Sequence, residues 1–558
     1  MKRGRYSDFI ADLITAWTPF LAVFIALPIA IYVPNQIEFA YNISIVLTLS
    51  VIGVAFLIAL LPLYLIKPDL RARISHGLFF LGLFVFLSDL IAPPQWARFD
   101  GQEKLTEPLA PTLLQAVLAI LLILLWIKLP TDIVRRFGAC LTLTVFAFQP
   151  LALLRALPEA VAATNQLTHI SPDAVRSPAN LPNIYQFVFD GYSSLNFLGD
   201  LSSLDLARSL DSFVFFPRNL ANYNYTDASV PSFLTGRLFK AGSFKDFQRQ
   251  ATTSGIRREL HKLGYQIALY TPDKSRFWAY AGARDVTTGE QLAGEVLGDV
   301  QLLRLMQVTL VRVAPNWLRL KTLEASNGFL EQIADSYYKF SVPLIKRFIA
   351  DEEDRPALGR YVYVHVILPH PPLVWNEKCE PVETRSDYRS QSLCAVRLMG
   401  EIVHELKSLG RYENSMIIFQ SDHGIGPSYI QPTGELAYNA ASPEVRQRIQ
   451  SIKDVDGDRD PDDFLLRLHA LLAIKPPMSE HLPMVVSPAQ TQLADIAATI
   501  YGALGLEGVP TDGQSVFALS EEEVREIHTF VVSNPNIAHL SFTRGQGWRI
   551  YPSFHSTD

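Results

Sequence analysis

Long apolar runs dominate the first 160 residues of the chain, and shorter runs follow them. Five of the long runs could each cross a bilayer as a helix, and they cover residues 8–33, 43–66, 76–93, 112–129 and 137–156. Helices buried in a large soluble core are the alternative, but such a core does not need five runs of this length in succession. The pattern therefore predicts an α-helical transmembrane domain with five spans over residues 1–156.

Basic residues mark alternate ends of these spans. They fall before the first span, between the second and third, and between the fourth and fifth, as Lys2, Arg3, Arg5, Lys67, Arg71, Arg73, Lys128, Arg135 and Arg136. The intervening loops, 34–42 and 94–111, carry only Arg98 and Lys104. Because cytoplasmic loops are enriched in Lys and Arg, the N-terminus is predicted to be cytoplasmic and everything after residue 157 to lie on the outer side. The first run is too long for a removable signal peptide and lacks a small-residue cleavage site.

The pattern of apolar and polar residues changes after the last predicted span. Residues 157–182 contain several Ser and Pro residues and are expected to form a linker that leaves the membrane. Short β-rich runs then alternate with helical stretches, and the runs are NIYQFVFD at 183–190, YQIALY at 265–270, YVYVHVIL at 361–368, SMIIFQ at 415–420 and MVV at 484–486. Such continuous apolar strands favour a mainly parallel sheet covered on both faces. Residues 183–558 are therefore predicted to form an exterior α/β domain.

Two helices of this domain have recognisable boundaries in the sequence. Residues 384–409 place apolar side chains near a period of 3.6 residues, and Gly410 is a fitting stop. Ser520 and Glu523 form a capping box, which predicts a helix through His528.

A third segment, residues 296–320, mixes large apolar residues with Arg304, Arg312 and Arg319. Such a pattern more often belongs to a helix of the domain core. The alternative is a segment that lies on the membrane surface and helps a lipid to reach the domain. Pro315 breaks any single long helix over this segment.

Net charge and cysteine content indicate which partners and which compartment suit the exterior domain. The formal net charge of −6 gives no sign of a nucleic-acid partner. Cys140 lies inside the fifth span and is expected only to pack. Cys379 and Cys394 both lie in the exterior domain, where a disulfide that closes a surface loop suits an oxidising compartment. A zinc pair is the alternative, although these two thiols lack the close spacing of a CxxC motif.

Candidate catalytic residues follow two of the predicted strands. Asp190 ends the run at 183–190, and Asp422 and His423 come directly after SMIIFQS. Ligands bind at the carboxyl ends of strands in an open α/β sheet, so these side chains are expected to meet. The stretch YTDASVPSFLTGR at 225–237 supplies a hydroxyl, which attacks phosphorus or sulfur only where its proton is removed and the charge is neutralised. We therefore predict Thr226 as a metal-bound nucleophile, with the two aspartates and the histidine completing the ligand set.

The predicted ligand set indicates which ion would bind. Three oxygens and one nitrogen suit zinc or manganese, and a set of four favours zinc. Gly424 would let the backbone bend closely around the ion. Taken singly, Asp190 would cap the next helix and Thr226 would hydrogen-bond in a turn. Their common position after strands favours the metal site.

Three motifs together resemble a known superfamily. They are DGY at 190–192, TDASVPSFLTG at 226–236 and SDHG at 421–424, in this order. The second is similar to the sulfatase stretch that ends in LTG, and this ending aligns Thr226 with the Cys or Ser nucleophile of sulfatases, while Val230 replaces their Arg. The motifs resemble the sulfatase-like branch of the alkaline phosphatase superfamily. Threonine in a TxxSxP pattern looks like the membrane-bound phosphoethanolamine transferases and, more loosely, the lipoteichoic acid synthases.

The same resemblance implies roles for three histidines. His370 follows a predicted strand and resembles a histidine near the transferred phosphate, which implies a catalytic role as a phosphate ligand or as an acid. His481, in EHLPM, resembles a further substrate-binding histidine, and a loop histidine without a role is the alternative. His365, inside the strand, is expected to pack in the core or to face the site as a substrate-binding residue.

The resemblance also implies a double displacement. Thr226 would attack a phospholipid donor, and the head group, phosphoethanolamine or phosphoglycerol, would pass from a phosphothreonine intermediate to an envelope glycan or glycolipid. The protein would be a multi-pass protein of the bacterial inner membrane, with its catalytic domain on the periplasmic side. A membrane-anchored phosphatase, phosphodiesterase or sulfatase-like hydrolase is one alternative, and an inactive envelope scaffold is another.

Overall fold

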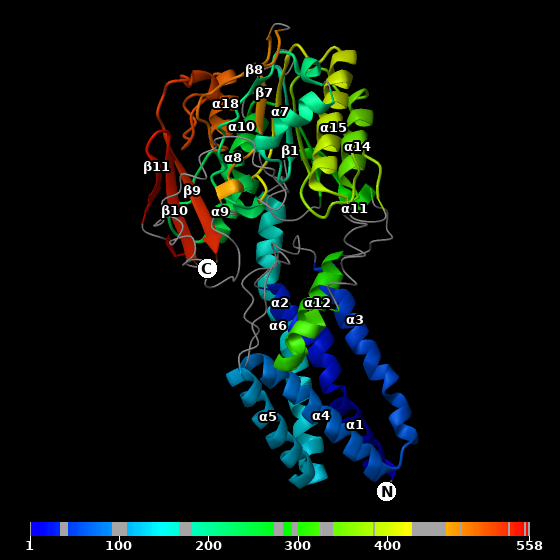
Figure 1. Cartoon of the computed structure of the whole chain (residues 1–558). Helices are drawn as coiled ribbons and strands as arrows, with labels where there is room; N and C mark the ends of the chain where they lie inside the picture. Colours follow the sequence, from blue (N-terminus) through cyan, green and yellow to red (C-terminus); the bar gives the residue numbers. More distant parts are fainter. Residues whose placement is uncertain are drawn as a thin grey trace. The chain divides into compact units, whose positions relative to one another are not determined.

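The structure is a computed structural model, and it forms two compact units (Figure 1). The first unit is Met1–Ala163 with Gly298–Ala334, and the second is Thr164–Leu297 with Asp335–Asp558. The chain therefore passes between the units three times, because a segment from the middle of the second unit folds with the first. The structure describes residues 2–33, 43–91, 109–166, 181–204, 206–272, 283–292, 300–323, 325, 339–382, 386–426, 465–479, 482–533, 536–551 and 554–555.

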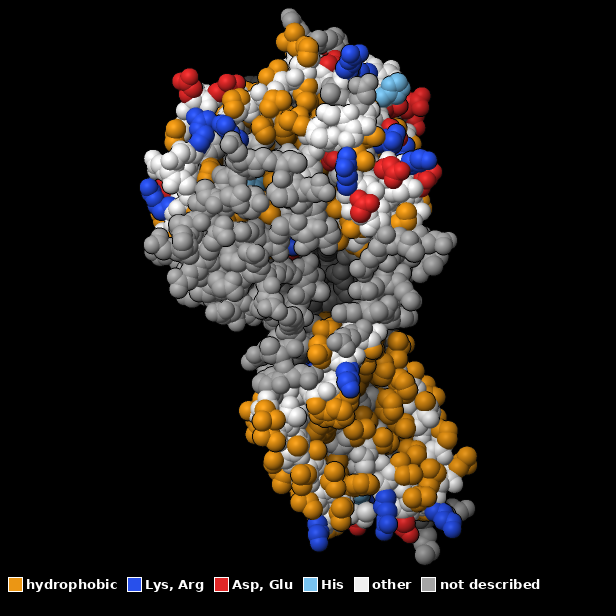
Figure 2. Space-filling model, in the orientation of Figure 1, with side chains coloured by type: hydrophobic (Ala, Val, Ile, Leu, Met, Phe, Trp, Pro, Cys, Tyr) orange, Lys and Arg blue, Asp and Glu red, His pale blue; other side chains and the backbone are white. Residues whose placement is uncertain are grey.

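The first unit is built from apolar helices. Among its described residues, five stretches are long and apolar enough to cross a membrane, namely Tyr6–Tyr32, Ser44–Leu63, Pro68–Ile91, Leu109–Lys128 and Thr131–Leu154. This confirms the prediction of five apolar helices. The elements are α1 (Lys2–Leu21), η1 (Ala22–Ala26), α2 (Leu27–Tyr32), α3 (Ser44–Ala59), η3 (Leu61–Leu65), α4 (Pro68–Ile91), α5 (Leu109–Lys128) and α6 (Thr131–Gln166). The face of this unit seen in Figure 2 is largely hydrophobic, far beyond the apolar patches that soluble proteins expose.

A buried carboxylate joins three of these helices. Asp12 of α1 is fully buried, and its Oδ2 lies 2.8 Å from Arg71 Nε of α4. Its Oδ1 lies 2.7 Å from Arg135 Nε of α6. Charges inside an apolar bundle are tolerated when they are paired, so this cluster fixes how the three helices pack.

A mixed sheet forms the middle of the second unit. In the described part of the chain it has eight strands in the order β4-β3-β5-β1-β6-β7-β2-β8. They are β1 (Asn183–Phe189), β2 (Val214–Phe215), β3 (Gln266–Thr271), β4 (Ala283–Thr288), β5 (Arg360–Val366), β6 (Ser415–Gln420), β7 (Leu472–Lys475) and β8 (Val485–Val486). Strand β7 is antiparallel to β6 and β2, and the other pairs are parallel. The prediction of a mainly parallel sheet is therefore confirmed.

Helices cover both faces of this sheet, as continuous apolar strands require. On one face, α8 (Thr226–Thr235), α10 (Ile256–Lys262) and α18 (Asp495–Ala503) share a hydrophobic core with the strands. On the other face, α14 (Ser341–Glu352) places Phe348 against Tyr185 and Phe187 of β1. Helix α14 packs on α15 (Tyr388–Ser408), and α15 packs on α7 (Ser194–Ser203) (Figure 1). The remaining elements are η5 (Ala207–Leu210), α9 (Phe244–Thr253), α11 (Gly289–Leu292) and η10 (Val516–Ala518).

Helix α15 matches the helix predicted at 384–409, and Gly410 follows it with a φ of 65°. The end of the chain differs from its prediction. It forms an antiparallel sheet of β9 (Glu526–Ser533), β10 (Asn536–Thr543), β11 (Gly547–Ile550) and β12 (Phe554–His555). His528 lies in β9, so the predicted helix through this residue was wrong. Alternate residues Ile527, Thr529 and Val531 are buried, and this period of two overrides the capping signal before it.

The segment that folds with the first unit begins with α12 (Val300–Val313). Leu305 and Val308 of α12 belong to a core cluster with Trp17, Leu21 and Ile45. The interpretation of residues 296–320 as a core helix of the exterior domain was therefore wrong. An amphipathic pattern shows that a helix has an apolar face, but it does not show which unit covers that face.

Candidate metal centre

Three neighbouring strands carry most of the candidate site. Strand β1 lies between β5 and β6 and runs parallel to both, so their carboxyl ends lie at one edge of the sheet. Asp190 follows β1, Asp422 and His423 follow β6, and His365 is the next-to-last residue of β5. All four side chains are buried.

Thr226 reaches the same place as the first residue of α8. Its Oγ1 lies 3.4 Å from His423 Nε2. The N-terminus of a helix favours a negative charge, which suits a phosphoryl group at this position. The rest of the motif is structural, because Ser229 Oγ donates to the Tyr223 carbonyl (3.1 Å) and Gly236, with a φ of 66°, ends the helix.

The distances among the predicted ligands suit one small cation. His423 Nε2 lies 3.5 Å from Asp422 Oδ2 and 3.7 Å from Asp190 Oδ1. Ligand atoms around a tetrahedral ion with bonds of about 2.1 Å are about 3.4 Å apart. His423 Nε2 therefore lies at close to ligand spacing from an oxygen of each aspartate and from the Thr226 hydroxyl.

The hydrogen bonds of these residues leave the expected atoms available to a cation. His423 Nδ1 donates to the Gly424 carbonyl (2.7 Å), which leaves Nε2 as the ring nitrogen nearest the two carboxylates. Asp422 Oδ1 accepts from the amides of Gly191 (3.2 Å) and His423 (3.0 Å). Asp422 Oδ2 and Asp190 Oδ1 are buried without a hydrogen-bond partner among the described residues. Buried carboxylate oxygens of this kind need a cation, so the site fits a divalent metal.

Electrostatics favour the ionised form of Asp190. Burial raises the pKa of this carboxyl, but His370, His365 and His423 around it outweigh burial and hold the pKa below its ordinary value. Asp190 is therefore anionic at neutral pH.

Two further histidines come within reach of the site. Two groups of three residues have potential ligand atoms within 4.8 Å of one another, namely Asp190, His370 and His423, and Asp190, His365 and Asp422. His365 faces the site, since its Nε2 lies 3.6 Å from Asp190 Oδ2. His481, predicted to bind substrate, lies outside the described residues.

At two positions near the site, a glycine allows another part of the chain to pack directly against the backbone. Gly191 has a φ of 70°, and a Cβ on it would lie 3.1 Å from His370 Cδ2. A Cβ on Gly424 would lie 2.6 Å from the His469 carbonyl oxygen and 2.8 Å from that of Leu466. A glycine is therefore needed at position 424 because the backbone of Leu466 and His469 leaves no room for a side chain.

Gln391 of α15 holds the loop that carries His370, a role that sequence reasoning missed. Its side chain is fully buried. Its Oε1 accepts from the amides of Val374 (2.8 Å) and Trp375 (3.1 Å), and its Nε2 donates to the carbonyls of Pro369 and His370 (both 3.0 Å). The helical period predicts that residue 391 is buried, but nothing in the sequence indicates that it bonds to this loop.

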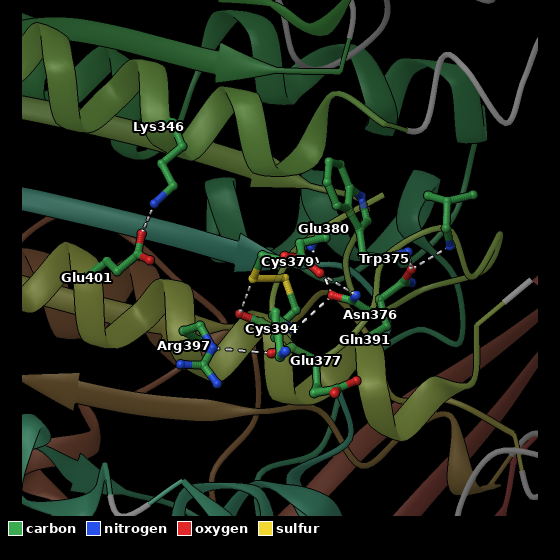
Figure 3. Close-up of a disulfide and its surroundings, with 12 residues drawn as sticks. Lys346, Trp375, Asn376, Glu377, Cys379, Glu380, Gln391, Cys394, Arg397 and Glu401 are labelled. Carbon is green, nitrogen blue, oxygen red and sulfur yellow. Dashed lines mark hydrogen bonds and ion pairs between the residues drawn. A yellow bond between two sulfur atoms is a disulfide. The ribbon is translucent and has the colours of Figure 1, made fainter. Parts of the chain in front are cut away.

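A disulfide holds the same loop at a second point. Cys379 and Cys394 are joined, and Cys394 lies one turn after Gln391 on α15 (Figure 3). The bond spans a sequence separation of 15, and a loop of about this length is stabilised by roughly 3 kcal/mol when it is closed. Cys140 is a free cysteine on α6.

Gln391→Ala is expected to lower kcat roughly 10- to 100-fold, because the loop that positions His370 loses four hydrogen bonds. Metal content is expected to stay unchanged, since the residues of the cation site are not touched. Steady-state kinetics with metal analysis checks both. Arg397→Ala is the matched control, because Arg397 donates to the Glu377 carbonyl from the same helix. Equal losses in the two variants, or loss of metal from the first, would argue against this positioning role.

The family model described as Sulfatase matches residues 189–444. This part of the chain is a sulfatase-like domain of the alkaline phosphatase superfamily. The match includes both strand-end aspartates and the helix that begins at Thr226, so the resemblance seen in the motifs is confirmed. Enzymes of this superfamily generally use a divalent metal, which agrees with the donor atoms of the site.

The sulfatase-like domain is also similar to solved structures at low identity. A phosphonate monoester hydrolase from Silicibacter pomeroyi has 14% identity and a TM-score of 0.40, with 67% of this chain and 89% of that chain covered. The C-terminal periplasmic domain of EcEptC from Escherichia coli has 10% identity and a TM-score of 0.38, with 67% and 93% covered. The lipoteichoic acid synthase LtaP from Listeria monocytogenes has 14% identity and a TM-score of 0.37, with 70% and 90% covered. Similarity of this degree carries no argument about activity, and a comparison with curated protein sequences found no match.

Proposed function

We propose that this protein is a metal-dependent transferase that moves a phospholipid head group, phosphoethanolamine or phosphoglycerol, to an envelope glycan or glycolipid. The observation that carries the proposal is the Thr226 hydroxyl, which lies at a helix N-terminus and 3.4 Å from His423 Nε2. The five apolar helices support a lipid donor, because an enzyme with a soluble substrate has no need to stay at the bilayer.

The proposed cation is zinc, with manganese as the alternative, and Thr226 and three other residues would hold it. These are Asp190, Asp422 and His423. When bound, the cation would lower the pKa of the hydroxyl and neutralise charge on the phosphoryl oxygens.

Two side chains, Thr226 and His370, would act in the first step. The Thr226 hydroxyl would lose its proton to solvent, its oxygen would form a bond to phosphorus, and the bond from phosphorus to the diacylglycerol oxygen would break, which leaves a phosphothreonine. His370 Nδ1 donates to the Pro371 carbonyl (2.6 Å), so its Nε2 is the atom that would give a proton to the departing oxygen. In the second step the same nitrogen would take a proton from the acceptor hydroxyl, and the Thr226 oxygen would leave.

The proposed setting is the bacterial inner membrane. Residues 1–156 would span it, residues 157–182 would link, and the catalytic residues of 183–558 would face the periplasm. The basic residues before the first span and between the second and third support this orientation.

Purified full-length protein in liposomes that contain head-group-labelled phosphatidylethanolamine or phosphatidylglycerol tests the proposal. We expect diacylglycerol release and label on Thr226, with transfer when an acceptor glycolipid is added. Steady release of free head-group phosphate without a transfer product would instead identify a hydrolase. Absence of any lipid turnover with a fully metal-loaded protein would contradict both reactions and favour a scaffold.

A further inference from the structure

Helix α12 comes from the middle of the second unit's chain but packs in the first unit. It contacts α2, α3 and α4. Its Leu305 is fully buried and its Val308 is 6% exposed, in a core cluster that includes Trp17 and Ile29. Helix α12 is therefore part of the hydrophobic core of the first unit.

Polar contacts fix the segment to two of the long apolar helices. Arg312 Nε lies 2.8 Å from Asp89 Oδ1 of α4. The amide of Asn316 donates to Gln115 Oε1 of α5 (2.6 Å), and Asn316 Nδ2 donates to Thr112 Oγ1 (2.8 Å). Asn316 and Gln115 are each 3% exposed, so these bonds are shielded from solvent. These contacts hold the segment in a defined position on α4 and α5.

Arg319 folds the end of the segment back onto α12. Its guanidinium donates to the carbonyls of Ala314 (3.1 Å) and Arg312 (3.4 Å), and its side chain is 1% exposed. A cation that binds the last carbonyls of a helix compensates the negative end of the helix dipole. The turn after α12 is thereby held in place without a carboxylate.

Three large apolar side chains of this anchored segment are exposed. Leu310 is 40% exposed, Trp317 is 58% exposed and Leu320 is 37% exposed. We propose that residues 300–323 are a lipid-contacting element whose exposed side chains are covered by phospholipid. The helices on which it packs are apolar enough to cross a bilayer, and Trp beside charged residues is typical of the head-group boundary.

This inference does not depend on the reaction. It gives the second unit an attachment to the bilayer beyond the last apolar helix, because the chain enters the segment at residue 298 and leaves it at residue 334. Three chain connections restrict the movement of a domain more than one does.

Spin labels test the lipid contact in the full chain. Cysteine is introduced at position 310, 317 or 320 with Cys140→Ser as background, and the protein is placed in phosphatidylethanolamine and phosphatidylglycerol liposomes. We expect oxygen to relax these labels more than a water-soluble nickel chelate does. Labels at Phe517 and Val524, which are 42% and 55% exposed in the second unit, are the controls and should show the reverse. A water-like pattern at 310, 317 and 320 would overturn the proposal.

A second measurement needs no introduced cysteine. Lipids brominated near the head group should quench part of the tryptophan fluorescence of the unmodified protein, and Trp317→Phe should remove some of that quenched part. Equal quenching in the two proteins would contradict lipid contact at Trp317.

Discussion

Thr226→Ala is expected to abolish the labelled enzyme intermediate and to lower lipid turnover by roughly four orders of magnitude or more, because the variant lacks the attacking oxygen. Thr226→Ser keeps a hydroxyl at the same position and should retain both the label and part of the activity. Mass spectrometry of the protein after incubation with labelled lipid, together with initial rates of diacylglycerol release, measures the two effects.

Ser232 of the same helix offers a matched control. Its side chain is fully buried, and its Oγ has no hydrogen-bond partner among the described residues. Ser232→Ala therefore removes a hydroxyl from α8 without breaking a described hydrogen bond, and we expect unchanged turnover and no loss of stability. If Thr226→Ala still formed a covalent intermediate, another residue would be the nucleophile.

Asp190→Asn and Asp422→Asn are each expected to release the metal and to lower activity at least about 100-fold. Each substitution replaces an anionic oxygen that is buried without a hydrogen-bond partner by a neutral amide, which binds a cation far more weakly. Metal analysis of the purified variants should show less than one ion per chain. The rise in melting temperature that added metal causes in the wild type should also disappear, because a ligand stabilises only the state that binds it.

Asp512→Asn is the control for these two variants. Asp512 accepts from the Leu238 amide (2.8 Å) and pairs with Lys240 (2.8 Å), away from the candidate site. The variant should bind metal and respond to it as the wild type does. Full metal occupancy in both Asp190→Asn and Asp422→Asn would show that the ion binds elsewhere.

The strands around the site could be predicted because their sequences are extreme. The runs at 183–189 and 415–420 are buried at every position, so composition alone indicated central strands of a covered sheet. The carboxyl ends of parallel strands lie at one edge of the sheet, which is where Asp190 and His423 are expected. The five apolar helices could also be predicted from the sequence, because a membrane-spanning helix is defined mainly by its length and its apolar content.

Other features depend on contacts between distant segments, which a local pattern does not encode. The capping signal at Ser520 and Glu523 was outweighed by the pairing of β9 with β10. The partner of α12 was misjudged because its apolar face fits the bundle as well as it would fit a sheet. Gln391 was missed because its four hydrogen bonds go to a loop 16 to 22 residues away along the chain.

Anomalous diffraction from crystals of the metal-loaded protein would show whether Thr226, Asp190, Asp422 and His423 share one cation. We predict an anomalous peak about 2.0–2.2 Å from Thr226 Oγ1, from His423 Nε2 and from one oxygen of each aspartate. A fully occupied ion that lies beyond bonding distance of the Thr226 oxygen would rule out Thr226 as a metal-bound nucleophile.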